Sequence, residues 1–337
     1  MSQSLNNHFF LCCDWGTSSF RLRLVASQDY EIKGEFTSSS GVATVFKEWE
    51  KQNVQNRSDF YTAFLKHNIH ELANVLAVNL DNTPLIVSGM ASSSLGMEEL
   101  PYALLPFDID GKNASFKIFH NFNGIAPLML ISGVKSIDDV MRGEEVQLIG
   151  LFKLNEILFQ ESQQLVFVFP GTHSKHIQFN NGSIRHFKTY MTGEIFNMVK
   201  EHSILKDSVS NQLLLEIRDK SDIDAFLQGI ECSSQSSILH NLFTVRTNHL
   251  FDILSKKQNL HYLSGLIIGT EIRELKQKEF DNLFVCCGKN LFECYKLAFN
   301  TIFPKGKITF LEPEMIDKAT IAGQIELFNL KHNSLNE

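Results

Sequence analysis

Two copies of a Gly-Thr pattern carry the side chains best suited to chemistry in this chain. The first copy reads D-W-G-T-S-S at residues 14–19, and the second reads P-G-T-H-S-K at residues 170–175. A glycine turn lets the backbone approach a ligand closely, and its amides can point toward an anion. We therefore expect two phosphate-binding turns, one in each half of the chain, that bind a polyphosphate from both sides. The candidate phosphate-binding residues are Gly16, Thr17, Ser18, Ser19, Gly171, Thr172, His173, Ser174 and Lys175.

Asp14 distinguishes the first copy, because the second copy has no acidic residue. An ionised carboxylate at the end of a buried strand is unfavourable unless a cation or hydrogen-bond donors surround it. Magnesium bound by one or two carboxylates and by substrate phosphates is a common arrangement in proteins. Asp14 is therefore a candidate catalytic residue and metal ligand. The alternative is an ordinary β-hairpin whose aspartate caps its own turn.

The segment R-G-E-E, residues 142–145, places two carboxylates at the start of a predicted helix. The helix dipole stabilises negative charge at this end, and one carboxylate could accept a proton from an attacking hydroxyl. Glu144 and Glu145 are both candidate catalytic residues. An acidic first helical turn without a catalytic role is the alternative.

A third glycine, Gly288, lies between an apolar strand and a predicted helix in C-C-G-K-N. A junction of this kind is suited to lie under a nucleotide. The chain has no G-x-x-x-x-G-K-[ST] loop, no G-x-G-x-x-G after a strand and no G-x-S-x-G elbow. These absences argue against a Walker-type nucleotidase, a dinucleotide-binding domain and an α/β-hydrolase.

The elements that must position these residues alternate between strands and helices. Apolar runs before each turn, and the alternation of Arg21 and Arg23 with leucines, predict two β-hairpins. Ser136-x-x-Asp139 has the pattern of a helix capping box. Hairpins followed by strands and helices, repeated once, predict an α/β fold with two domains, 8–140 and 141–330. The expected strands cover 9–13, 21–25, 84–87, 128–132 and 283–287, and the expected helices cover 60–76, 144 onward, 263–275, 290–302 and 319–330.

Composition narrows the class of protein further. The chain has 337 residues, 43% of them hydrophobic, and a net charge of −7. A mildly acidic chain without basic runs is a poor candidate for nucleic-acid binding. The start of the chain is polar, and no apolar stretch approaches the length of a membrane span. The six cysteines show no metal-ligand spacing, so structural zinc and disulfides are not expected. The expectation is a cytoplasmic protein without nucleic-acid or membrane partners.

Five segments together resemble the 2-dehydro-3-deoxygalactonokinase family. They are D-W-G-T-S-S, S-G-M-A-S-S-S-L-G-M-E-E-L-P-Y, D-V-M-R-G-E-E-V-Q-L-I-G, P-G-T-H-S-K-H and F-K-T-Y-M-T-G-E-I-F, and the resemblance runs in order from about residue 9 to residue 325. It implies two ribonuclease-H-like domains of the actin-like ATPase fold with an active-site cleft between them. It also implies a kinase that uses ATP and Mg²⁺ to phosphorylate the 6-hydroxyl of 2-dehydro-3-deoxy-D-galactonate in galactonate catabolism.

The resemblance implies roles for individual residues as well. Asp14 would organise Mg²⁺, the two turns would hold the phosphates, and Gly288 would lie under the adenosine. R-G-E-E also resembles the G-E-E element of exopolyphosphatases of the same superfamily, in which a glutamate is catalytic, and we prefer Glu144 as the base. The candidate substrate-binding residues are Met90, Ser93, Ser94, Arg142 and Lys188.

The sequence departs from the family pattern S-R-Q-G-W at Ser94, where the pattern places an arginine that could bind the substrate carboxylate. Either another cation, Arg142 or Lys188, takes the carboxylate, or the substrate is a different sugar acid. A phosphohydrolase of the exopolyphosphatase type and a sugar or nucleotide sensor are further alternatives. A sensor is disfavoured because no basic or DNA-binding segment is appended. The expected partners are a sugar acid and ATP, and a homodimer is compatible with this assignment.

Overall fold

The chain folds into two compact units in the computed structural model, which describes residues 9–52, 56–122, 124–125, 127–155, 164–211, 217 and 219–334. Unit 1 comprises Met1–Glu161, Gly182–His186 and Asp317–Glu337, and unit 2 comprises Ser162–Asn181 and Phe187–Ile316. These limits differ from the predicted domains 8–140 and 141–330, because residues 141–161 and the end of the chain group with unit 1.

The sheet of unit 1 has the strand order β3-β2-β1-β4-β8-β7. β1 pairs antiparallel with β2 and parallel with β4, and β4 pairs parallel with β8. Because the carboxyl ends of β1, β4 and β8 share one edge of the sheet, Asp14 lies at the centre of that edge. The strands are β1 (Phe9–Trp15), β2 (Phe20–Ala26), β3 (Ile32–Ser38), β4 (Leu85–Gly89), β7 (Phe116–Phe119) and β8 (Leu128–Ile131).

The sheet that carries the second turn repeats this order. Its strands follow one another as β15-β14-β11-β12-β13, with β11 antiparallel to β12 and parallel to β14. The first residues of β13, Ser183 and Ile184, belong to unit 1 and pair with β6 (Phe107–Asp108). The strands are β11 (Gln164–Phe169), β12 (Ser174–Asn180), β13 (Ser183–Tyr190), β14 (Asn282–Cys286) and β15 (Ile308–Leu311).

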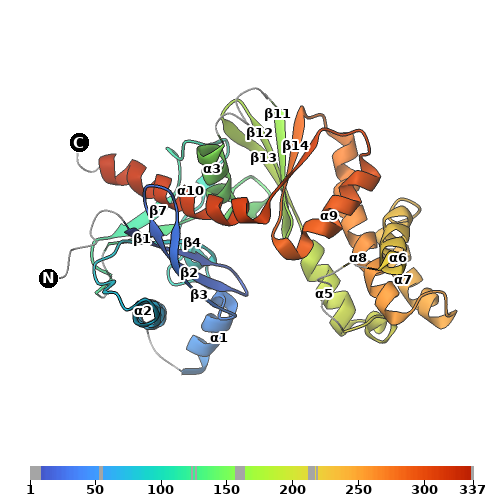
Figure 1. The fold of residues 1–337 in the computed structure, drawn as a ribbon, viewed down its shortest axis with the longest axis horizontal. Coiled ribbons are helices and arrows are strands. Elements are labelled where there is room, and N and C mark those ends of the chain that lie inside the picture. Colours follow the sequence, from blue (N-terminus) through green and yellow to red (C-terminus); the bar gives the residue numbers. More distant parts are fainter. Residues whose placement is uncertain are drawn as a thin grey trace. The chain divides into compact units, whose positions relative to one another are not determined.

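The two sheets therefore share one topology. Reading β1, β2, β3, β4 and β8 as strands one to five gives the order 3-2-1-4-5, and β11 to β15 give the same order. Figure 1 labels the first four strands of each set, β1 to β4 and β11 to β14. Both glycine turns join the first strand to the second in this scheme. This confirms the prediction of an α/β fold with two ribonuclease-H-like parts, and it explains why the Gly-Thr pattern occurs twice.

Helices pack on the sheet of unit 1 around a core that contains Trp15, Phe20 and Tyr61. Ser136–Asp139 forms a turn and not the predicted helix cap, because strand β10 (Val140–Met141) and not a helix follows it. The N–H of Ser136 donates to the carbonyl of Asp139 at 2.9 Å across this turn. The helices are α1 (Val42–Gln52), α2 (Arg57–Leu76), η1 (Met90–Ser92), α3 (Glu144–Leu154) and α10 (Pro313–Ser334), and a small sheet contains β5 (Ala103–Leu104), β9 (Val134–Lys135) and β10 (Val140–Met141).

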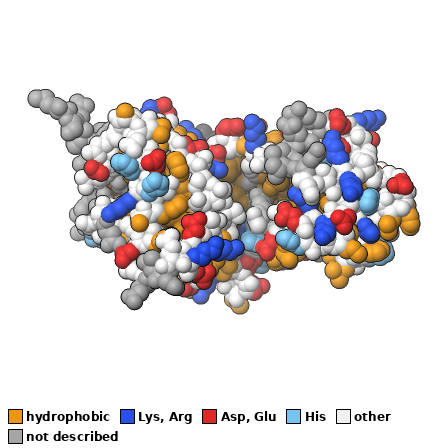
Figure 2. Space-filling model, turned by 90° about the horizontal axis from the view of Figure 1, so that it is seen from below, with side chains coloured by type: hydrophobic (Ala, Val, Ile, Leu, Met, Phe, Trp, Pro, Cys, Tyr) orange, Lys and Arg blue, Asp and Glu red, His pale blue; other side chains and the backbone are white. Residues whose placement is uncertain are grey.

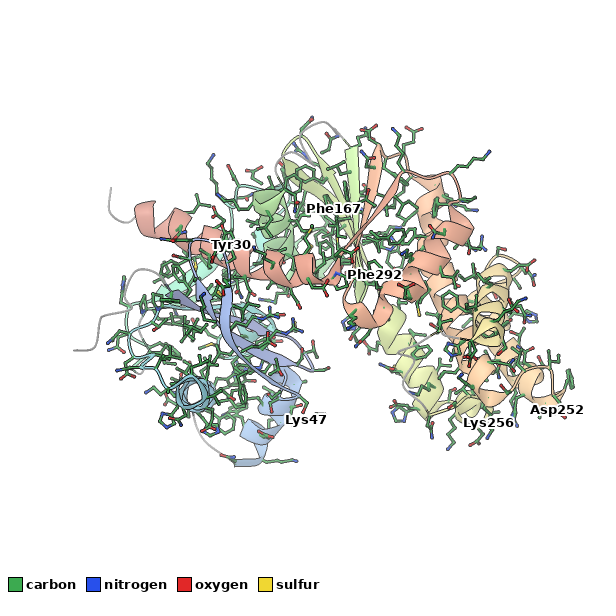
Figure 3. The ribbon with its side chains drawn as sticks, viewed as in Figure 1. Tyr30, Lys47, Phe167, Asp252, Lys256 and Phe292 are labelled. Carbon is green, nitrogen blue, oxygen red and sulfur yellow. The ribbon has the colours of Figure 1, made fainter. Side chains whose placement is uncertain are left out.

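Unit 2 has a core of its own, which contains Val166 and Val168 of β11 together with Phe299. Phe167 of β11, labelled in Figure 3, is fully buried and stacks on Phe284 of β14. None of the helices in the described part of the chain is both long and apolar enough to span a membrane. The helices of unit 2 are α5 (Thr192–His202), η2 (Ile204–Ser208), α6 (Lys220–Cys232), α7 (Ile238–Leu250), α8 (Lys256–Arg273), η3 (Glu274–Gln277) and α9 (Lys289–Ile302).

Charged side chains of both signs are interspersed over the face of the molecule drawn in Figure 2. This face therefore offers no extended basic surface of the kind that nucleic acid binds.

Candidate active site

Asp14 lies near the carboxyl end of β1, with Ser88 of β4 and Arg21 of β2 as its neighbours in the pairing register. Its side chain is half-buried, and no group of the described residues donates a hydrogen bond to the carboxylate. Burial raises the pKa of the Asp14 carboxyl, although the positive charges of Arg21 and Arg23 oppose the increase. An ionised Asp14 therefore needs a further positive partner.

A cation at Asp14 would take most of its ligands from outside the protein. Among the residues that the structure describes, no three His, Cys, Asp or Glu side chains gather as a metal-binding cluster. Magnesium is usually held in this manner, by one or two carboxylates together with waters and substrate phosphates. The residues present thus fit a magnesium ion that arrives with a phosphorylated substrate.

Two glycines with positive φ bring Asp14 beside the R-G-E-E segment. Gly89, at the end of β4, has φ +86°, and a Cβ built there would lie 2.7 Å from the Trp15 carbonyl oxygen and 3.5 Å from Asp14 Oδ1. Gly143 has φ +107°, and its Cβ would lie 3.9 Å from the Cα of Gly89. A side chain at Gly89 would therefore push the ends of β1 and β4 apart. The site therefore requires residues without side chains, Gly89 and Gly143, between Asp14 and the start of α3. The sequence motifs did not reveal this requirement.

The two adjacent glutamates have different environments. Glu145 is 2% exposed, and both its carboxylate oxygens lie 2.9 Å from the N–H of Gly143, so its side chain caps the start of α3. Burial and the neighbouring Glu144 raise the pKa of Glu145 to about 8. Glu144 is half-buried, and one of its oxygens accepts the N–H of Arg142 at 3.1 Å. Because a carboxyl with a pKa of about 8 is protonated at neutral pH, Glu144 is better suited to accept a proton.

A buried glutamine of α10 ties the strands of this site together. Nε2 of Gln324 donates to the carbonyl of Cys13 and to the hydroxyl of Ser88, both at 2.8 Å. Since Cys13 and Ser88 directly precede Asp14 and Gly89, this amide fixes the relative position of β1 and β4. Sequence reasoning missed Gln324, because an isolated glutamine within a helix belongs to no motif.

The first glycine turn is short and its hydroxyls are exposed. The N–H of Gly16 donates to the carbonyl of Ser19 at 2.9 Å, and α1 begins against the turn, where the N–H of Ala43 donates to the Thr17 carbonyl at 3.1 Å. Thr17, Ser18 and Ser19 are exposed, and their hydroxyls make no hydrogen bond within the described residues. These hydroxyls can therefore donate to a bound anion.

Arg142 is held against the loop that follows Gly89. Its Nη1 donates to the carbonyl of Ser92 at 2.7 Å and to the hydroxyls of Ser92 and Ser132, and its guanidinium lies 4.2 Å from the centre of the Tyr102 ring. Nε and Nη2 make no hydrogen bond to any described residue. This leaves two parallel donors of the guanidinium, the pair that carboxylates bind best.

The two predicted serines of the same loop differ in exposure. Ser93 is buried, and its hydroxyl donates to the carbonyl of Met90 at 2.7 Å. Ser94 is exposed, and its carbonyl accepts Nη1 of Arg57 at 2.5 Å. Arg57 also lies about 6 Å from two aromatic rings of α1. The structure thus adds a cation beside Ser94 that the sequence did not suggest, because Arg57 belongs to a helix start 37 residues earlier.

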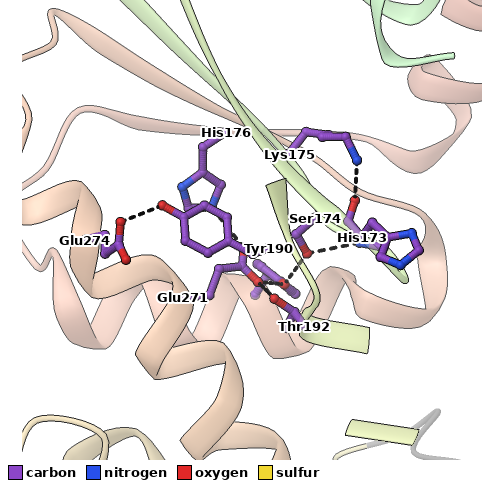
Figure 4. Close-up of polar contacts among 10 residues, drawn as sticks. His173, Ser174, Lys175, His176, Tyr190, Thr192, Glu271 and Glu274 are labelled. Carbon is purple, nitrogen blue, oxygen red and sulfur yellow. Dashed lines mark hydrogen bonds and ion pairs between the residues drawn. The ribbon is translucent and has the colours of Figure 1, made fainter. Parts of the chain in front are cut away.

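Ser174 in the second turn, drawn in Figure 4, has a different environment from its counterpart Ser19 in the first. Ser174 is fully buried, whereas Ser19 is exposed. The hydroxyl of Ser174 accepts the N–H of Gly171 at 3.3 Å and lies 3.2 Å from the Tyr295 hydroxyl. Ser174 therefore holds the turn in shape from inside, a placement that the repeated pattern alone could not indicate.

The other residues of the second turn are fixed by local contacts. Nζ of Lys175 donates to the carbonyl of His173 at 3.1 Å, and the ring of His173 pairs with Glu194. Thr172 is exposed, and its carbonyl accepts the N–H of Glu194 at 3.1 Å. Gly193 packs so closely that a Cβ there would lie 2.7 Å from the carbonyl oxygen of Gly171. The start of α5 thus supports this turn, as the start of α1 supports the first.

Two parallel strands of unit 2 are also followed by glycines, which leave the backbone accessible. Gly171 follows β11 and Gly288 follows β14, and a Cβ built on either glycine would have no atom of the described residues within 4 Å. Gly288 precedes α9, whose first turn has no side-chain cap. An apolar cavity of about 80 Å³ is lined by Gly171 and by residues of α5, α8 and α9. Unit 2 therefore offers backbone amides for phosphate groups at the edge where its parallel strands end.

Lys188 lies in unit 2, whereas Met90, Ser93, Ser94 and Arg142 lie in unit 1. Its ammonium pairs with Glu274 at 3.2 Å. The structure therefore gathers four of the five predicted substrate-binding residues in one unit, and Lys188 already has an anionic partner.

Comparison with known proteins adds a family to this geometry. The sequence profile of the 2-keto-3-deoxy-galactonokinase family matches residues 14–324. The chain is 29% identical to the 2-dehydro-3-deoxygalactonokinase of Escherichia coli (strain K12) over 225 residues, which cover 66% of this chain and 72% of that protein. It is 30% identical over 267 residues to DgoK1 of Rhizobium meliloti (strain 1021), a probable 2-dehydro-3-deoxygalactonokinase, with 78% of this chain and 79% of that protein covered.

A solved structure shares the fold. The crystal structure of a candidate 2-dehydro-3-deoxygalactonokinase from Sinorhizobium meliloti superposes with a TM-score of 0.75 at 24% sequence identity. The superposition covers 94% of this chain and 95% of that chain. The likeness therefore extends over both units.

Proposed function

The chain belongs to the 2-keto-3-deoxy-galactonokinase family of phosphotransferases, and we propose that it transfers the γ-phosphate of ATP to the 6-hydroxyl of 2-dehydro-3-deoxy-D-galactonate. This reaction would be a step in galactonate catabolism. The observation that carries the proposal is the arrangement of Asp14, Gly89 and Gly143. A carboxylate to which no described residue donates a hydrogen bond lies there beside the start of α3 at Glu144.

Charge neutralisation by unit 1 is the first part of the mechanism. Phosphoryl transfer depends mainly on positioning and on stabilising the charge of the transferred group. Asp14 would hold Mg²⁺, which would neutralise phosphate charge when it is bound. The hydroxyls of Thr17, Ser18 and Ser19 would donate to the phosphate oxygens. The raised pKa of Asp14 supports this role, because none of the described residues donates a hydrogen bond that would compensate for the burial of the carboxylate.

Glu144 would accept the proton of the attacking hydroxyl. A general base works best when it is ionised at the working pH. Glu145 is protonated at neutral pH and occupied with the N–H of Gly143, which favours a structural role. We therefore assign the base to Glu144 and the helix cap to Glu145.

The nucleotide would bind unit 2 through its backbone. Thr172 is exposed, and Gly171 and Gly288 leave room for a ligand to approach the main chain. Lys175 would add positive charge near the phosphates, as the sequence predicts, and His173 would contact them. Gly288, which precedes α9, would lie under the adenosine.

The acceptor carboxylate would bind Nε and Nη2 of Arg142. A guanidinium recognises a carboxylate through two parallel hydrogen bonds. Arg142 is preferred to Lys188, because Lys188 is paired with Glu274 and Arg142 adjoins the loop at residues 90–97. Met90, Ser93 and Ser94 would shape the acceptor site around it.

A kinase screen tests this proposal. The wild-type protein would be incubated with ATP, Mg²⁺ and a panel of 2-keto-3-deoxy sugar acids, and product would be detected by mass spectrometry. A Ser94→Arg variant, run in parallel, tests whether the missing arginine narrows the choice of acid. Phosphate release without any acceptor would instead favour a phosphohydrolase. If no acid were phosphorylated while an ATP analogue bound normally, the acceptor assignment would be wrong.

A further inference from the structure

A buried chain of hydrogen bonds connects the second glycine turn to Glu271 of α8 (Figure 4). It begins at the N–H of Gly171, which donates to Ser174 Oγ at 3.3 Å. Ser174 Oγ lies 3.2 Å from the Tyr295 hydroxyl, and that hydroxyl donates to Glu271 Oε2 at 2.7 Å. Ser174, Tyr295 and Glu271 are all buried, so water does not compete for these bonds.

The direction of every bond in this chain follows from counting protons. A carboxylate can only accept, so the single hydroxyl proton of Tyr295 points to Glu271. Burial and the charge of Glu271 raise the pKa of Tyr295 well above its usual value, so this proton is retained at neutral pH. The Tyr295 oxygen must then accept from Ser174, whose only proton is used in that bond. Ser174 consequently has lone pairs for the N–H of Gly171 and no proton for a phosphate.

Glu271 also joins the other elements that surround the turn. Its Oε2 accepts the hydroxyl of Thr192, the first residue of α5. Its Oε1 lies 2.9 Å from Nε2 of His176 on β12, and both side chains are almost completely buried. His176 Nδ1 has no hydrogen-bond partner among the described residues. One carboxylate on α8 therefore binds groups from α5, α9 and β12.

We propose that Glu271 and Tyr295 are positioning residues for nucleotide binding, because they fix the Ser174 hydroxyl and thereby the backbone of the Gly171–Lys175 turn. This inference rests on the proposed function, in which that turn binds the phosphates of ATP. It assigns Ser174 to the internal support of the turn and leaves the exposed groups of Thr172 and His173 to contact the ligand. Neither Glu271 nor Tyr295 touches the nucleotide in this scheme.

Nucleotide affinity in variants of this chain tests the inference. The dissociation constant of a non-hydrolysable ATP analogue with Mg²⁺ would be measured by calorimetry for wild type, Tyr295→Phe, Ser174→Ala and the double variant. Each single variant should bind about tenfold more weakly, the effect of one neutral hydrogen bond. The double variant should bind no more than about twofold more weakly than the weaker single variant, because both changes break the same chain.

Tyr190→Phe is the matched control. Tyr190 packs on the His176 ring at 4.4 Å, but its hydroxyl donates to Glu274 and not to the turn. Its affinity for the nucleotide should stay within about twofold of wild type. With saturating ATP, kcat of Tyr295→Phe should stay within about threefold of wild type, since only nucleotide binding is perturbed.

Three possible results distinguish failure of the inference from failure of the proposed function. Wild-type affinity in Tyr295→Phe would overturn the inference and leave the proposed function intact. Independent losses that multiply in the double variant would also overturn it, because Ser174 and Tyr295 would then act separately. A wild-type protein that binds no nucleotide would refute the proposed ATP site itself. Near-ultraviolet circular dichroism shows whether each variant is folded. If Tyr295→Phe does not fold, the nucleotide affinity of Ser174→Ala tests the inference in its place.

Discussion

Replacing Glu145 by glutamine should stabilise unit 1 and leave catalysis almost unchanged. The pKa of Glu145 is raised from an ordinary value of 4.5 to about 8 in the folded chain. Between pH 4.5 and about pH 8, the Glu145 carboxyl is deprotonated in the unfolded chain but still protonated in the folded chain. The free energy of unfolding of the wild type therefore falls as pH rises through this interval, by about 1.4 kcal/mol per pH unit, and levels off above pH 8.

The size of the effect follows from the same interval. At pH 7 the carboxyl lowers the free energy of unfolding by about 3 kcal/mol relative to a neutral group, and at pH 4 by almost nothing. Glu145 is 2% exposed, so solvent does not screen this effect. Glutamine keeps an oxygen that can accept the N–H of Gly143. The gain in Glu145→Gln should therefore be close to zero at pH 4 and about 3 kcal/mol at pH 7.

Tryptophan fluorescence during chemical denaturation measures this gain, because both tryptophans, Trp15 and Trp49, belong to unit 1. The matched variant Glu144→Gln should lose about 10²- to 10⁴-fold in kcat, whereas Glu145→Gln should stay within about threefold of wild type. If the free energies of unfolding of Glu145→Gln and wild type differed by the same amount at pH 4 and pH 8, the raised pKa of Glu145 would be refuted. A large loss of kcat in Glu145→Gln with normal kcat in Glu144→Gln would reverse the two roles.

Three further changes test other parts of the site. Asp14→Asn should abolish detectable turnover and raise the free energy of unfolding at neutral pH, because it removes a carboxyl whose pKa is raised by burial; the gain should disappear below pH 3, and its absence at pH 7 would count against the proposed need for a cation. Gly89→Ala should lower the free energy of unfolding by roughly 1–3 kcal/mol, since φ is +86° and the added Cβ would lie 2.7 Å from the Trp15 carbonyl oxygen; unchanged denaturation would show that the strand ends can move apart. Arg142→Met should raise KM for the sugar acid at least tenfold without changing KM for ATP, and equal increases in both would argue that Arg142 does not bind the acceptor carboxylate.

Much of the fold was predictable from local pattern. The Gly-Thr turns lie between paired strands, as their mainly apolar and buried flanking residues predict, and α3 begins at Glu144 as the preceding glycine indicates. The repeated topology of the two sheets follows from the repeated order of hairpin, strand and helix.

The rest of the site depends on packing between distant segments. Gly89 and Gly143 approach each other only in the folded unit, and Gln324 returns from the end of the chain to bind Cys13 and Ser88. The spacing of apolar residues along the chain does not indicate contacts between segments that are distant in the sequence. The repeat also suggested equal roles for Ser19 and Ser174, but Tyr295 lies against only the second. Residues in one motif can therefore differ in role when their tertiary neighbours differ.

The most direct test of the proposed reaction is the identity of the product. Phosphorus NMR of a mixture of the protein, ATP, Mg²⁺ and 2-dehydro-3-deoxy-D-galactonate should show ADP and one new phosphomonoester whose phosphorus couples to the two protons of C6. ADP and inorganic phosphate without any new phosphomonoester, or a phosphomonoester coupled to a single proton, would contradict transfer to the 6-hydroxyl.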